Sequence, residues 1–454
     1  MSPIAFLRER FAAAGAATAM VWRDRERSYA WLVESLDAWR AHLDDAGVEP
    51  GDVVALTADF SPRSAAALLA LWERRCIVVP LRRTMEGPRA ALLATAEADV
   101  EVTLDDDESH RTTRFPRPAT PHGLFEKLRE AGRPGLVLFS SGSSGAPKGI
   151  VHDATLLLEK FKTARHARST LAFLSFDHIG GINTLLHVLS NGGTVVTVAD
   201  RQPATVCAAI DRYGVRVLPT SPTFLNLLLL SGALEAFSLA SLETVTYGTE
   251  VMPEETLARL HARLPRVKLQ QTYGLSEVGI LRSKSESSDS LWVRLGGEGI
   301  ETRVRHGMLE IRSPSTMVGY LNAPTPLTDD GWFMTGDVVD ERDGFLRIHG
   351  RRSDLINVGG EKVFPAEIEN VLLQMEGVVD AAVHGEPHAI LGRIVVATVH
   401  LSTGEALPAF RARMAQFCRP RMEPYKVPQK VIVSKEPLGG DRFKKRRGGA
   451  SEPG

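Results

Sequence analysis

Short apolar runs alternate with helical patterns over the first 130 residues. Val53–Thr57 and Cys76–Leu81 have the length and composition of buried strands, and Ala65–Trp72 between them has a helical pattern. A strand, a helix and a second strand in this order predict a βαβ unit and a parallel sheet. Residues 105–122 are acidic and then rich in Thr, Pro and Arg, which predicts a surface loop.

The same rhythm continues to about residue 290. Leu136–Phe139 is a compact apolar run that predicts a strand. It is followed by a Gly/Ser-rich loop and by an amphipathic helix predicted from Ala154 to Arg165. Further strands are predicted over Thr194–Val198, Val215–Pro219 and Thr244–Tyr247, with Leu225–Leu230 inside a helix.

The pattern changes near residue 290. Short strands separated by glycine are predicted over Leu291–Arg294, Glu301–Arg305, Met308–Arg312 and Phe345–Ile348. They indicate a small antiparallel unit at about 290–350. Residues 353–454 again give strand and helix signals, with Pro365–Met375 a well-marked helix. We therefore expect an α/β protein: a large N-terminal domain over 1–352 with parallel-rich sheets, helices and the small β unit, and a smaller α+β domain over 353–454.

Composition narrows the class of protein. The chain has 454 residues, 54 Lys+Arg against 55 Asp+Glu, and 43% hydrophobic residues. At roughly 100–200 residues per domain, this length allows two to four packing units. The net charge of −1 argues against nucleic-acid or membrane binding driven by excess positive charge. The apolar share indicates a folded chain and argues against intrinsic disorder.

The cysteines and the apolar runs argue against further classes. Cys76, Cys207 and Cys418 are far apart, so neither a disulfide framework nor a zinc ribbon is indicated. Apolar runs are all shorter than the roughly 18 residues that a membrane helix needs. The Ala-rich segment Phe11–Trp22 imitates a signal peptide, but it leads directly into charged, strand-like sequence. We expect a cytoplasmic protein.

A Gly/Ser-rich loop is the first candidate for chemistry. Ser140, Ser141, Gly142, Ser143, Ser144 and Gly145 lead to Ala146-Pro147-Lys148-Gly149 between a predicted strand and a predicted helix. Glycines allow backbone N–H groups to converge, and Ser hydroxyls and a Lys ammonium add donors for polyphosphate oxygens. The loop lacks the Walker A spacing, because Lys148 does not directly follow Gly145. The alternative is a flexible linker of the same composition.

With three further motifs, the chain resembles the adenylate-forming superfamily of acyl- and aryl-CoA ligases, peptide-synthetase adenylation domains and luciferases. Residues 271–277 (QTYGLSE) are similar to its Tyr-Gly-x-Ser/Thr-Glu motif, and 331–337 (GWFMTGD) to its Trp-x-x-Thr-Gly-Asp motif. Residues 350–356 and 359–369 resemble its hinge and the helix that follows, and the hinge motif is similar to that of o-succinylbenzoate–CoA ligases. The segment Met308–Asn322 resembles its small β-barrel. The likeness extends from about residue 28 to 445.

The resemblance implies an ATP-dependent reaction in two halves. A carboxylate attacks the α-phosphate of ATP and gives an acyl-adenylate and pyrophosphate, and a nucleophile then displaces AMP. Because two anions meet in the first half, charge compensation and positioning supply most of the catalysis. The residues expected to bind ATP are Ser140, Ser141, Gly142, Ser143, Ser144, Gly145, Lys148, Gly248, Thr249, Glu250, Thr272, Tyr273, Gly274, Ser276, Asp337 and Arg351.

Individual roles follow from the matched positions. Glu277 is expected to anchor Mg²⁺, a hard cation that prefers oxygen ligands. Ser276 would donate to the α-phosphate, and Tyr273 would lie against the adenine opposite residues 248–250. Asp337 would accept from the ribose hydroxyls, near Arg351. A bare Gly-Asp turn is the structural alternative for Asp337.

The acyl and coenzyme A sites are predicted from glycines and one histidine. His178 matches an aromatic position that lines the acyl pocket and the approach of the thiol, although a lone histidine can equally be structural. Its flanking glycines are expected to leave space for a ring or a chain. The residues expected at the acid and CoA pocket are His178, Gly180, Gly181, Gly248, Gly279, Gly359 and Gly360.

The C-terminus departs from the family pattern. The family usually carries a Gly-Lys pair whose lysine bridges the carboxylate and the α-phosphate, but counting from Pro437 puts Phe443 at that position. A shift of one residue makes Lys444 the predicted catalytic lysine, with Lys445 second. The alternative is that the cations within 442–447 form a solvated tail. Ser353 stands at the family's hinge, around which a mobile C-terminal domain would swing.

Three functions remain open from the sequence. The first is an acid–thiol ligase that uses ATP, Mg²⁺ and coenzyme A to make an acyl- or aryl-CoA. The second is a stand-alone adenylating enzyme that passes the acyl group to a carrier-protein thiol or an amine. The third is a non-catalytic nucleotide-binding relative. The Gly-rich pocket and the chain length favour an aromatic or medium-sized acid, and no nucleic-acid partner or membrane insertion is expected. The oligomeric state is left open, with a homodimer as one option.

Overall fold

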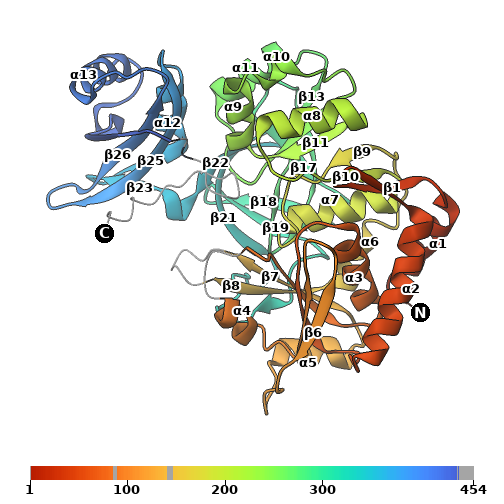
Figure 1. Cartoon of the computed structure of the whole chain (residues 1–454). Helices are drawn as coiled ribbons and strands as arrows, with labels where there is room; N and C mark the ends of the chain where they lie inside the picture. The colour runs from red at the N-terminus through yellow and green to blue at the C-terminus, as the bar shows by residue number, and fades with distance from the viewer. Residues whose placement is uncertain (1, 85–88, 141–146, 437, 439–454) are drawn as a thin grey trace.

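The computed structural model describes residues 2–84, 89–140, 147–436 and 438. Two large sheets, a smaller antiparallel sheet and a C-terminal α+β unit make up the described chain (Figure 1). The predicted phosphate-loop residues Ser141, Gly142, Ser143, Ser144 and Gly145 lie outside the described residues, as do Lys444 and Lys445.

The first large sheet, here the β3 sheet, has seven strands. In spatial order they are β20 (Gly319–Tyr320), β8 (Lys148–Asp153), β7 (Gly135–Ser140), β4 (Ile77–Leu81), β3 (Val53–Thr57), β5 (Val100–Leu104) and β6 (His110–Arg114). The central four, from β7 to β5, are parallel, and the outer strands are antiparallel. Every residue of β3 and β4 is buried, which agrees with their continuous apolar sequences because parallel strands are covered on both faces.

The second large sheet, here the β12 sheet, also has seven strands. In spatial order they are β13 (Lys268–Gln271), β12 (Thr244–Tyr247), β11 (Val217–Thr220), β9 (Ser169–Leu171), β10 (Thr194–Val196), β1 (Thr18–Trp22) and β2 (Arg25–Ser28). All neighbours from β13 to β1 are parallel, and only β2 is antiparallel. The predicted parallel-rich sheets are confirmed.

Helices cover both sheets on both faces and give five layers. The helices are α1 (Ala5–Ala14), α2 (Tyr29–Asp45), α3 (Pro62–Glu73), α4 (Arg89–Thr95), α5 (Gly123–Glu130), α6 (Ala154–Glu159), α7 (Ile179–Ser190), α8 (Pro203–Tyr213), α9 (Pro222–Leu230), α10 (Ala233–Ala236) and α11 (Glu254–Arg263). One core joins α1, α2, α3, α6 and α7 to one face of each sheet. A second core packs α4 and α5 on the outer face of the β3 sheet, and a third packs α8, α9 and α11 on the outer face of the β12 sheet.

Local sequence explains where several helices begin. Ser61 caps α3 through the N–H of Ser64, the Ser64 hydroxyl returns a bond to the N–H of Ser61, and Pro62 occupies the first turn. The Ser221 hydroxyl accepts the Phe224 N–H at the start of α9, and Pro222 again occupies the first turn. These signals fix the helix starts at the carboxyl ends of β3 and β11, where the chain must leave the sheet.

Three predictions differ from the structure. Residues 105–122 are not a single loop, because β6 (His110–Arg114) pairs with β5; its side chains are mostly exposed, so the apolar alternation that marks a strand is missing. The strand β8 was not predicted. The predicted helix from Ala154 to Arg165 ends at Glu159, and the chain beyond α6 turns away with Lys160.

The small β unit is a six-stranded antiparallel sheet. Its strands are β16 (Arg282–Ser285), β17 (Trp292–Gly296), β22 (Phe345–Arg351), β21 (Phe333–Arg342), β19 (Met308–Arg312) and β18 (Glu301–Arg305) in spatial order. It shares a core with Tyr273 and Tyr320 from the neighbouring segments. A two-stranded hairpin, β14 (Gly274–Leu275) and β15 (Gly279–Ile280), precedes it in the chain.

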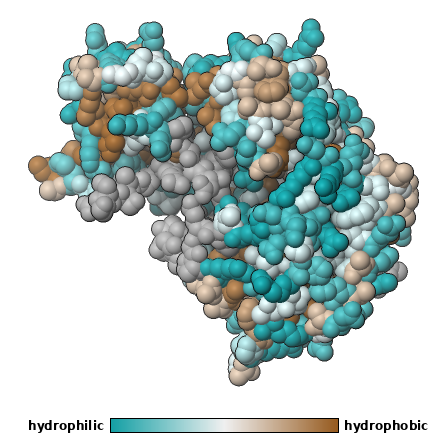
Figure 2. All heavy atoms as spheres, viewed as in Figure 1, coloured by the Kyte–Doolittle hydropathy of each residue, from teal (hydrophilic) through white to brown (hydrophobic). Residues whose placement is uncertain are grey.

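The C-terminal unit has its own sheet and core. Its strands are β23 (Ile356–Val358), β24 (Glu361–Val363), β25 (Val378–His388), β26 (Gly392–Leu401) and β27 (Lys430–Ser434), and its helices are α12 (Pro365–Leu373) and α13 (Leu407–Cys418). One short 3₁₀ helix, η1 (Arg352–Asp354), precedes these elements, and another, η2 (Pro424–Lys426), lies between α13 and β27. The core includes only residues between 356 and 433. The unit lies to one side of the larger part (Figure 1), and hydrophobic spheres gather on it in the view of Figure 2.

The structure also bears on the cysteines and on the apolar segments. Cys76, Cys207 and Cys418 are free and buried, and burial raises the pKa of Cys207 and Cys418 to about 11, so these thiols are poor nucleophiles at neutral pH. The segment Phe11–Trp22 that imitates a signal peptide is divided between α1 and β1. Among the described helices, none has the length and apolar character to span a membrane.

Candidate functional site

A buried carboxylate on β21 forms the centre of the candidate site. The Tyr273 hydroxyl donates to Oδ2 of Asp337 at 2.5 Å, and Arg351 Nε lies 3.7 Å from Oδ1. Gly336, just before the aspartate, has a φ of 75°, and the Asp337 N–H donates to the Thr335 hydroxyl at 3.0 Å. Tyr273 follows β13, so the fold joins two motifs that are 64 residues apart in the chain.

The electrostatics of this pair follow from burial. Asp337 is 6% exposed, and desolvation raises the pKa of its carboxyl, although the Tyr273 hydrogen bond and the Arg351 charge oppose that shift. Burial also raises the pKa of Tyr273 well above its ordinary value, so its hydroxyl stays a donor. The Arg351 side chain is exposed, so its guanidinium can also contact a polar ligand beside Asp337.

A second buried carboxylate lies near the first. The Tyr320 hydroxyl donates to Oε1 of Glu277 at 2.7 Å, and Lys148 Nζ stands 5.2 Å from the centre of the Tyr320 ring. Glu277 also contributes to the raised pKa of Asp337 by charge repulsion, which places the two carboxylates in one electrostatic neighbourhood. Lys148 from β8, Glu277 after β14 and Tyr320 on β20 thus meet at one end of the β3 sheet.

A buried histidine on β8 contacts the backbone of the loop that carries Ser276 and Glu277. His152 on β8 is fully enclosed, and its Nε2 lies 2.5 Å from the Ser276 carbonyl oxygen. Burial lowers the pKa of His152, so the ring is neutral at pH 7 and Nε2 can act as an N–H donor. The Glu277 carbonyl accepts the Met317 N–H at 2.7 Å. The loop backbone is therefore bonded on both sides.

Gly248, Thr249 and Glu250 leave β12 beside the Tyr273 segment. A Cβ at Gly248 would lie 2.7 Å from the Thr272 carbonyl oxygen, so only glycine permits this approach. Thr249 has a φ of 74°, an unusual conformation for a β-branched residue. The Glu250 carboxylate accepts the Thr223 N–H at 2.8 Å and the Thr223 hydroxyl, at the start of α9. Strain and close packing together mark this turn as a candidate ligand contact.

Other predicted residues have structural duties. A Cβ at Gly274 would lie 2.7 Å from the Gly279 carbonyl oxygen across the β14–β15 hairpin. Gly279 has a φ of 78°, and a Cβ added there would lie at ordinary contact distance, 3.7 Å, from Leu157 and Ser315. His178 caps α7, because its Nδ1 accepts the Gly180 N–H at 3.0 Å. This bond fixes the orientation of the ring.

The space expected beside Gly180 and Gly181 is filled. A Cβ at Gly181 would lie 2.0 Å from the Ser175 carbonyl oxygen, and one at Gly180 would lie 2.4 Å from Leu174 Cδ1. The first turn of α7 is thus pressed against residues 174–175, and these glycines are needed for close packing. The expectation that they leave room for a ring or a chain is wrong.

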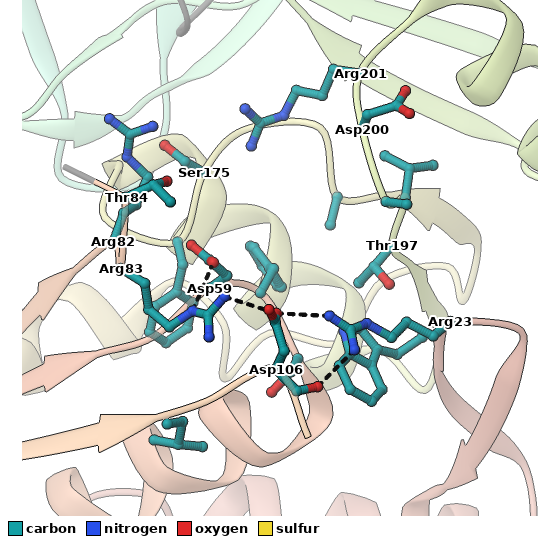
Figure 3. Close-up of a pocket in the computed structure, with 18 of the residues that line it drawn as sticks. Arg23, Asp59, Arg82, Arg83, Thr84, Asp106, Ser175, Thr197, Asp200 and Arg201 are labelled. Atoms are coloured by element: carbon teal, nitrogen blue, oxygen red, sulfur yellow. Dashed lines mark hydrogen bonds and ion pairs between the residues drawn. The ribbon is translucent and has the colours of Figure 1, made fainter. Parts of the chain in front are cut away.

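A cavity of about 430 Å³ opens at the carboxyl ends of strands from both large sheets (Figure 3). Asp106 after β5 accepts from Arg23 after β1 and pairs with Arg83 after β4. Arg82 pairs with Asp177 at 3.3 Å, directly before His178. Strand ends of parallel sheets are the usual place for ligands in α/β folds.

Arg201 differs from the other arginines of this cavity. Among the described residues, no carboxylate lies within ion-pair distance of its guanidinium, which faces the cavity in Figure 3. Burial and the neighbouring Arg82 lower the pKa of Arg201. The cavity therefore presents a cation that can pair with an anionic ligand.

The C-terminal candidates lie on the connection and on one hairpin. Ser353 is in the exposed 3₁₀ turn η1, where its hydroxyl contacts Asp354 Oδ1 at 3.0 Å. Gly359 and Gly360 have φ values of 61° and 97° in the β23–β24 turn, and the Gly360 N–H donates to Asn357 Oδ1 at 2.9 Å. Both glycines supply the turn conformation that other residues rarely adopt.

The residues present can accommodate a magnesium ion at Glu277. One carboxylate oxygen is engaged by Tyr320, which leaves Oε2 for a cation. Mg²⁺ in nucleotide sites is commonly held by one or two carboxylates together with phosphate oxygens and water, so a single glutamate is sufficient from the protein. No three-residue cluster of metal-binding side chains is found in the described part of the chain.

Two contributors to this site were missed from the sequence. Tyr320 falls within the segment Met308–Asn322 without an assigned role, and His152 was not singled out. Neither has a local signal, because the partners lie 43 and 124 residues away in the chain. The β-branched pair Ile150-Val151 could have indicated β8.

Comparison with known proteins agrees with the fold and the motifs. Residues 7–321 match the model of the AMP-binding enzyme family, and residues 367–439 match that of the AMP-binding enzyme C-terminal domain. The chain therefore belongs to the AMP-binding enzyme family and is an adenylate-forming enzyme of the acyl- and aryl-CoA ligase type, as its motifs predict.

The relatives include ligases for aromatic acids. An indoleacetate–CoA ligase from Aromatoleum aromaticum is 27% identical, over 92% of this chain and 91% of that protein. A 2-succinylbenzoate–CoA ligase from Geobacillus kaustophilus is also 27% identical, over 91% and 90%. The crystal structure of an anthranilate CoA ligase with anthranoyl-AMP has a TM-score of 0.82 at 19% identity, covering 98% of this chain and 95% of that one, which supports the fold.

Proposed function

We propose that this enzyme activates a carboxylic acid with ATP and transfers the acyl group to coenzyme A. The observation that carries the proposal is the buried Asp337 carboxylate, held by Tyr273 and Arg351 beside Glu277. This arrangement offers a carboxylate for ribose hydroxyls and a second carboxylate for a cation on the phosphates. Aromatic-acid ligases among the relatives support an aromatic or medium-sized substrate.

In the first half-reaction, a carboxylate oxygen of the acid attacks the α-phosphorus of ATP. A carbon–oxygen–phosphorus link forms, and the bond to pyrophosphate breaks. Asp337 would accept from the ribose hydroxyls, Tyr273 would lie against the adenine, and Ser276 would donate to the α-phosphate. The loop from Ser140 to Lys148 would hold the β- and γ-phosphates. A magnesium ion at Glu277 would supply charge compensation.

In the second half-reaction, the thiol sulfur attacks the acyl carbon, AMP leaves with the bonding electrons, and the thiol proton is released. We assign the 430 Å³ cavity, here the arginine cavity, to the phosphates of coenzyme A. Arg201, which has no ion pair among the described residues and lies over the Phe173 ring, supplies a cation there, and Ser175 and Phe176 extend the cavity to the loop that carries His178. Arginine pairs well with phosphate because its planar fork donates two parallel hydrogen bonds.

We further propose a domain boundary between residues 352 and 353, with Ser353 as the hinge. The C-terminal core is separate from the others, and only residues 352–355 connect β22 to β23. Rotation there would bring the Gly359–Gly360 turn beside the pantetheine arm in the second half-reaction. The free, buried cysteines support a reducing, cytoplasmic location.

Pyrophosphate exchange with a panel of carboxylic acids tests the first half. We expect one acid class to give exchange, and we expect Lys444→Ala to reduce it by roughly 10²–10³-fold, as for other lost transition-state donors. Lys445→Ala is the matched control for the assignment of the lysine. If both variants exchange as fast as the wild type, the lysine assignment is wrong. If no acid in a broad panel supports exchange, the proposed reaction is wrong.

Addition of free coenzyme A tests the acceptor. We expect the thiol to accelerate AMP formation, and Arg201→Gln to raise the KM for coenzyme A by about 10-fold with the KM for ATP unchanged, since a charged hydrogen bond is lost. Arg212→Gln, an exposed arginine outside the cavity, is the control. Exchange without any effect of coenzyme A would point instead to a carrier-protein thiol or an amine as acceptor.

A further inference from the structure

A second cavity has a strongly cationic wall. It measures about 890 Å³ and lies between α6, α7 and the start of the small β unit. Its described cationic residues are Lys160, Lys162, Arg165, Arg282, Lys284 and Arg294, against the carboxylates of Glu159 and Glu298. Glu159 is already paired with Lys162 at 2.5 Å. An excess of positive charge therefore faces the cavity.

Lys160 is the most enclosed of these cations. Its Nζ donates to Asn183 Oδ1 at 2.7 Å and to the Ile280 carbonyl oxygen at 2.9 Å, both neutral acceptors. Among the described residues, no carboxylate lies within ion-pair distance of this ammonium. Burial, together with the charge of Arg165, lowers the pKa of Lys160 to about 8. Since an ammonium has three N–H donors, one donor remains for a ligand.

The groups near Lys160 include a second cation, Arg165, and a neutral histidine, His187. Burial and the charge of Arg282 lower the pKa of Arg165, and the described residues give Arg165 no carboxylate partner. Burial, with Arg165, Lys160 and Arg168 nearby, lowers the pKa of His187 to about 4, so the ring is neutral at pH 7. Gathering like charges in a recess costs free energy that a bound anion would recover.

Two residues that line the cavity adjoin predicted site residues in the chain. Thr272 and Ile280 line it, and they adjoin Tyr273 and Gly279 in the chain. Asn183 and His187 reach it from α7, which begins directly after His178. At 1.5 Å of rise per residue, His187 lies roughly 13 Å along the helix from His178. Lys160 contacts Asn183 on this same helix, so one helix joins the cationic group to His178.

We propose that this cavity binds a second anionic group of the acid, so that the preferred substrate is a dicarboxylic acid. One carboxylate would react at the adenylation site, and the other would pair with Lys160 and Arg165. Asn183 would hold the ammonium in position from α7. The inference rests on the proposed adenylation reaction and specifies the substrate class of that same site.

The test compares matched acids in the pyrophosphate-exchange assay. The probes are straight-chain monocarboxylates and α,ω-dicarboxylates of equal length, from hexanoate and adipate to dodecanoate and dodecanedioate, with phenylacetate and its carboxyphenyl analogue. We expect a dicarboxylate to have a kcat/KM about 10- to 100-fold above its partner, in line with one charged hydrogen-bonded contact. Lys160→Met should abolish this preference by raising the KM for the dicarboxylate only. Lys162→Met, whose ammonium is already neutralised by Glu159, should retain it.

The outcomes separate the two proposals. Equal kcat/KM values within every pair, or a preference that Lys160→Met and Arg165→Gln both leave intact, would overturn the dicarboxylate inference while adenylation stands. Absence of exchange with every acid would instead contradict the adenylation reaction. Circular dichroism and unchanged KM for ATP in each variant verify that the variants are folded.

Discussion

Two side chains at the candidate centre face opposing physical demands. Asp337 is buried enough to raise the pKa of its carboxyl, yet its proposed duty of accepting ribose hydroxyls suits the charged form. The Tyr273 hydroxyl and the Arg351 guanidinium partly offset the desolvation cost. A residue kept under such a cost is a candidate for function rather than for stability.

Replacing Asp337 with asparagine should separate stability from function. A carboxyl whose folded-state pKa is raised binds a proton more readily in the native than in the unfolded chain. Its contribution to stability therefore falls as the pH rises from the pKa of the unfolded state to that of the folded state. Asp337→Asn carries no such penalty. Its Tm should exceed that of the wild type most at neutral pH, with a smaller difference at the most acidic pH the fold tolerates. Scanning calorimetry between these limits measures the difference.

The same variant should bind ATP more weakly, by about 10- to 100-fold, because a charged acceptor is lost. Isothermal titration with ATP provides the measurement. Asp340→Asn on the same strand, whose carboxylate is exposed and contacts His349, is the control for a general effect on β21. Tight ATP binding by Asp337→Asn would contradict the ribose assignment.

At the scale of elements, α7 shows how packing places a functional segment. Its first turn carries Gly180 and Gly181 against residues 174–175, and His178 caps the helix. Farther along, the same helix presents Asn183 and His187 to the cationic cavity. One helix therefore begins at His178 and carries residues that line the proposed dicarboxylate subsite.

Adding one methyl group at Gly181 should disturb this element. The Cβ of Gly181→Ala would meet the Ser175 carbonyl oxygen at 2.0 Å, so the helix start must shift. Overpacking of this kind costs typically about 1–3 kcal/mol of unfolding free energy. Urea denaturation measures the loss. Gly123→Ala, in the first turn of α5 with nothing within 4 Å of the new Cβ, should leave stability unchanged or raise it slightly.

At the scale of the whole molecule, few polar contacts join the C-terminal unit to the rest. The Asn226 side chain on α9 donates to the Val379 carbonyl oxygen at 2.9 Å, and the Glu255 N–H donates to Asn370 Oδ1 at 3.2 Å. His349 and Phe364 also approach with ring centres 5.6 Å apart. A modest interface of this kind suits units that must change their relative orientation.

Loss of the Asn226 contact should loosen this arrangement. Removing one hydrogen bond changes the free-energy difference between the docked and undocked orientations of the C-terminal unit by about 0.5–1.5 kcal/mol. The ratio of the two populations then changes roughly 2- to 10-fold. Because Arg351 and Arg352 are exposed on the connection, Asn226→Ala should be cut there faster by trypsin, as followed by mass spectrometry. Asn191→Ala, which loses a contact to His187 within the N-terminal part, is the control. Equal rates of cleavage would contradict a role for Asn226 at the interface.

Much of the fold could be predicted from sequence because its signals are local. Continuous apolar runs such as Val53–Thr57 mark strands buried on both faces, and the Gly- and Asp-containing motifs mark turns at strand ends. The predictions failed where local signals are weak. The strand β6 is polar along its length, and α6 ends next to Lys160, whose ammonium contacts the Ile280 carbonyl oxygen 120 residues away in the chain. Motif order was enough to predict the family and the carboxylates Glu277 and Asp337.

The sequence by itself determined the class of fold, the order of motifs and the residue types that an adenylating site requires. Only the tertiary structure decided which of them meet, that Tyr273 bonds Asp337 and Tyr320 bonds Glu277, and that the glycines of α7 serve packing. It also gathered Lys160, Arg165 and His187 around one cavity. The physical reason is that charge and desolvation act through space, so a cluster of cations from the segment after α6 and from β16 and β17 has no signature along the chain.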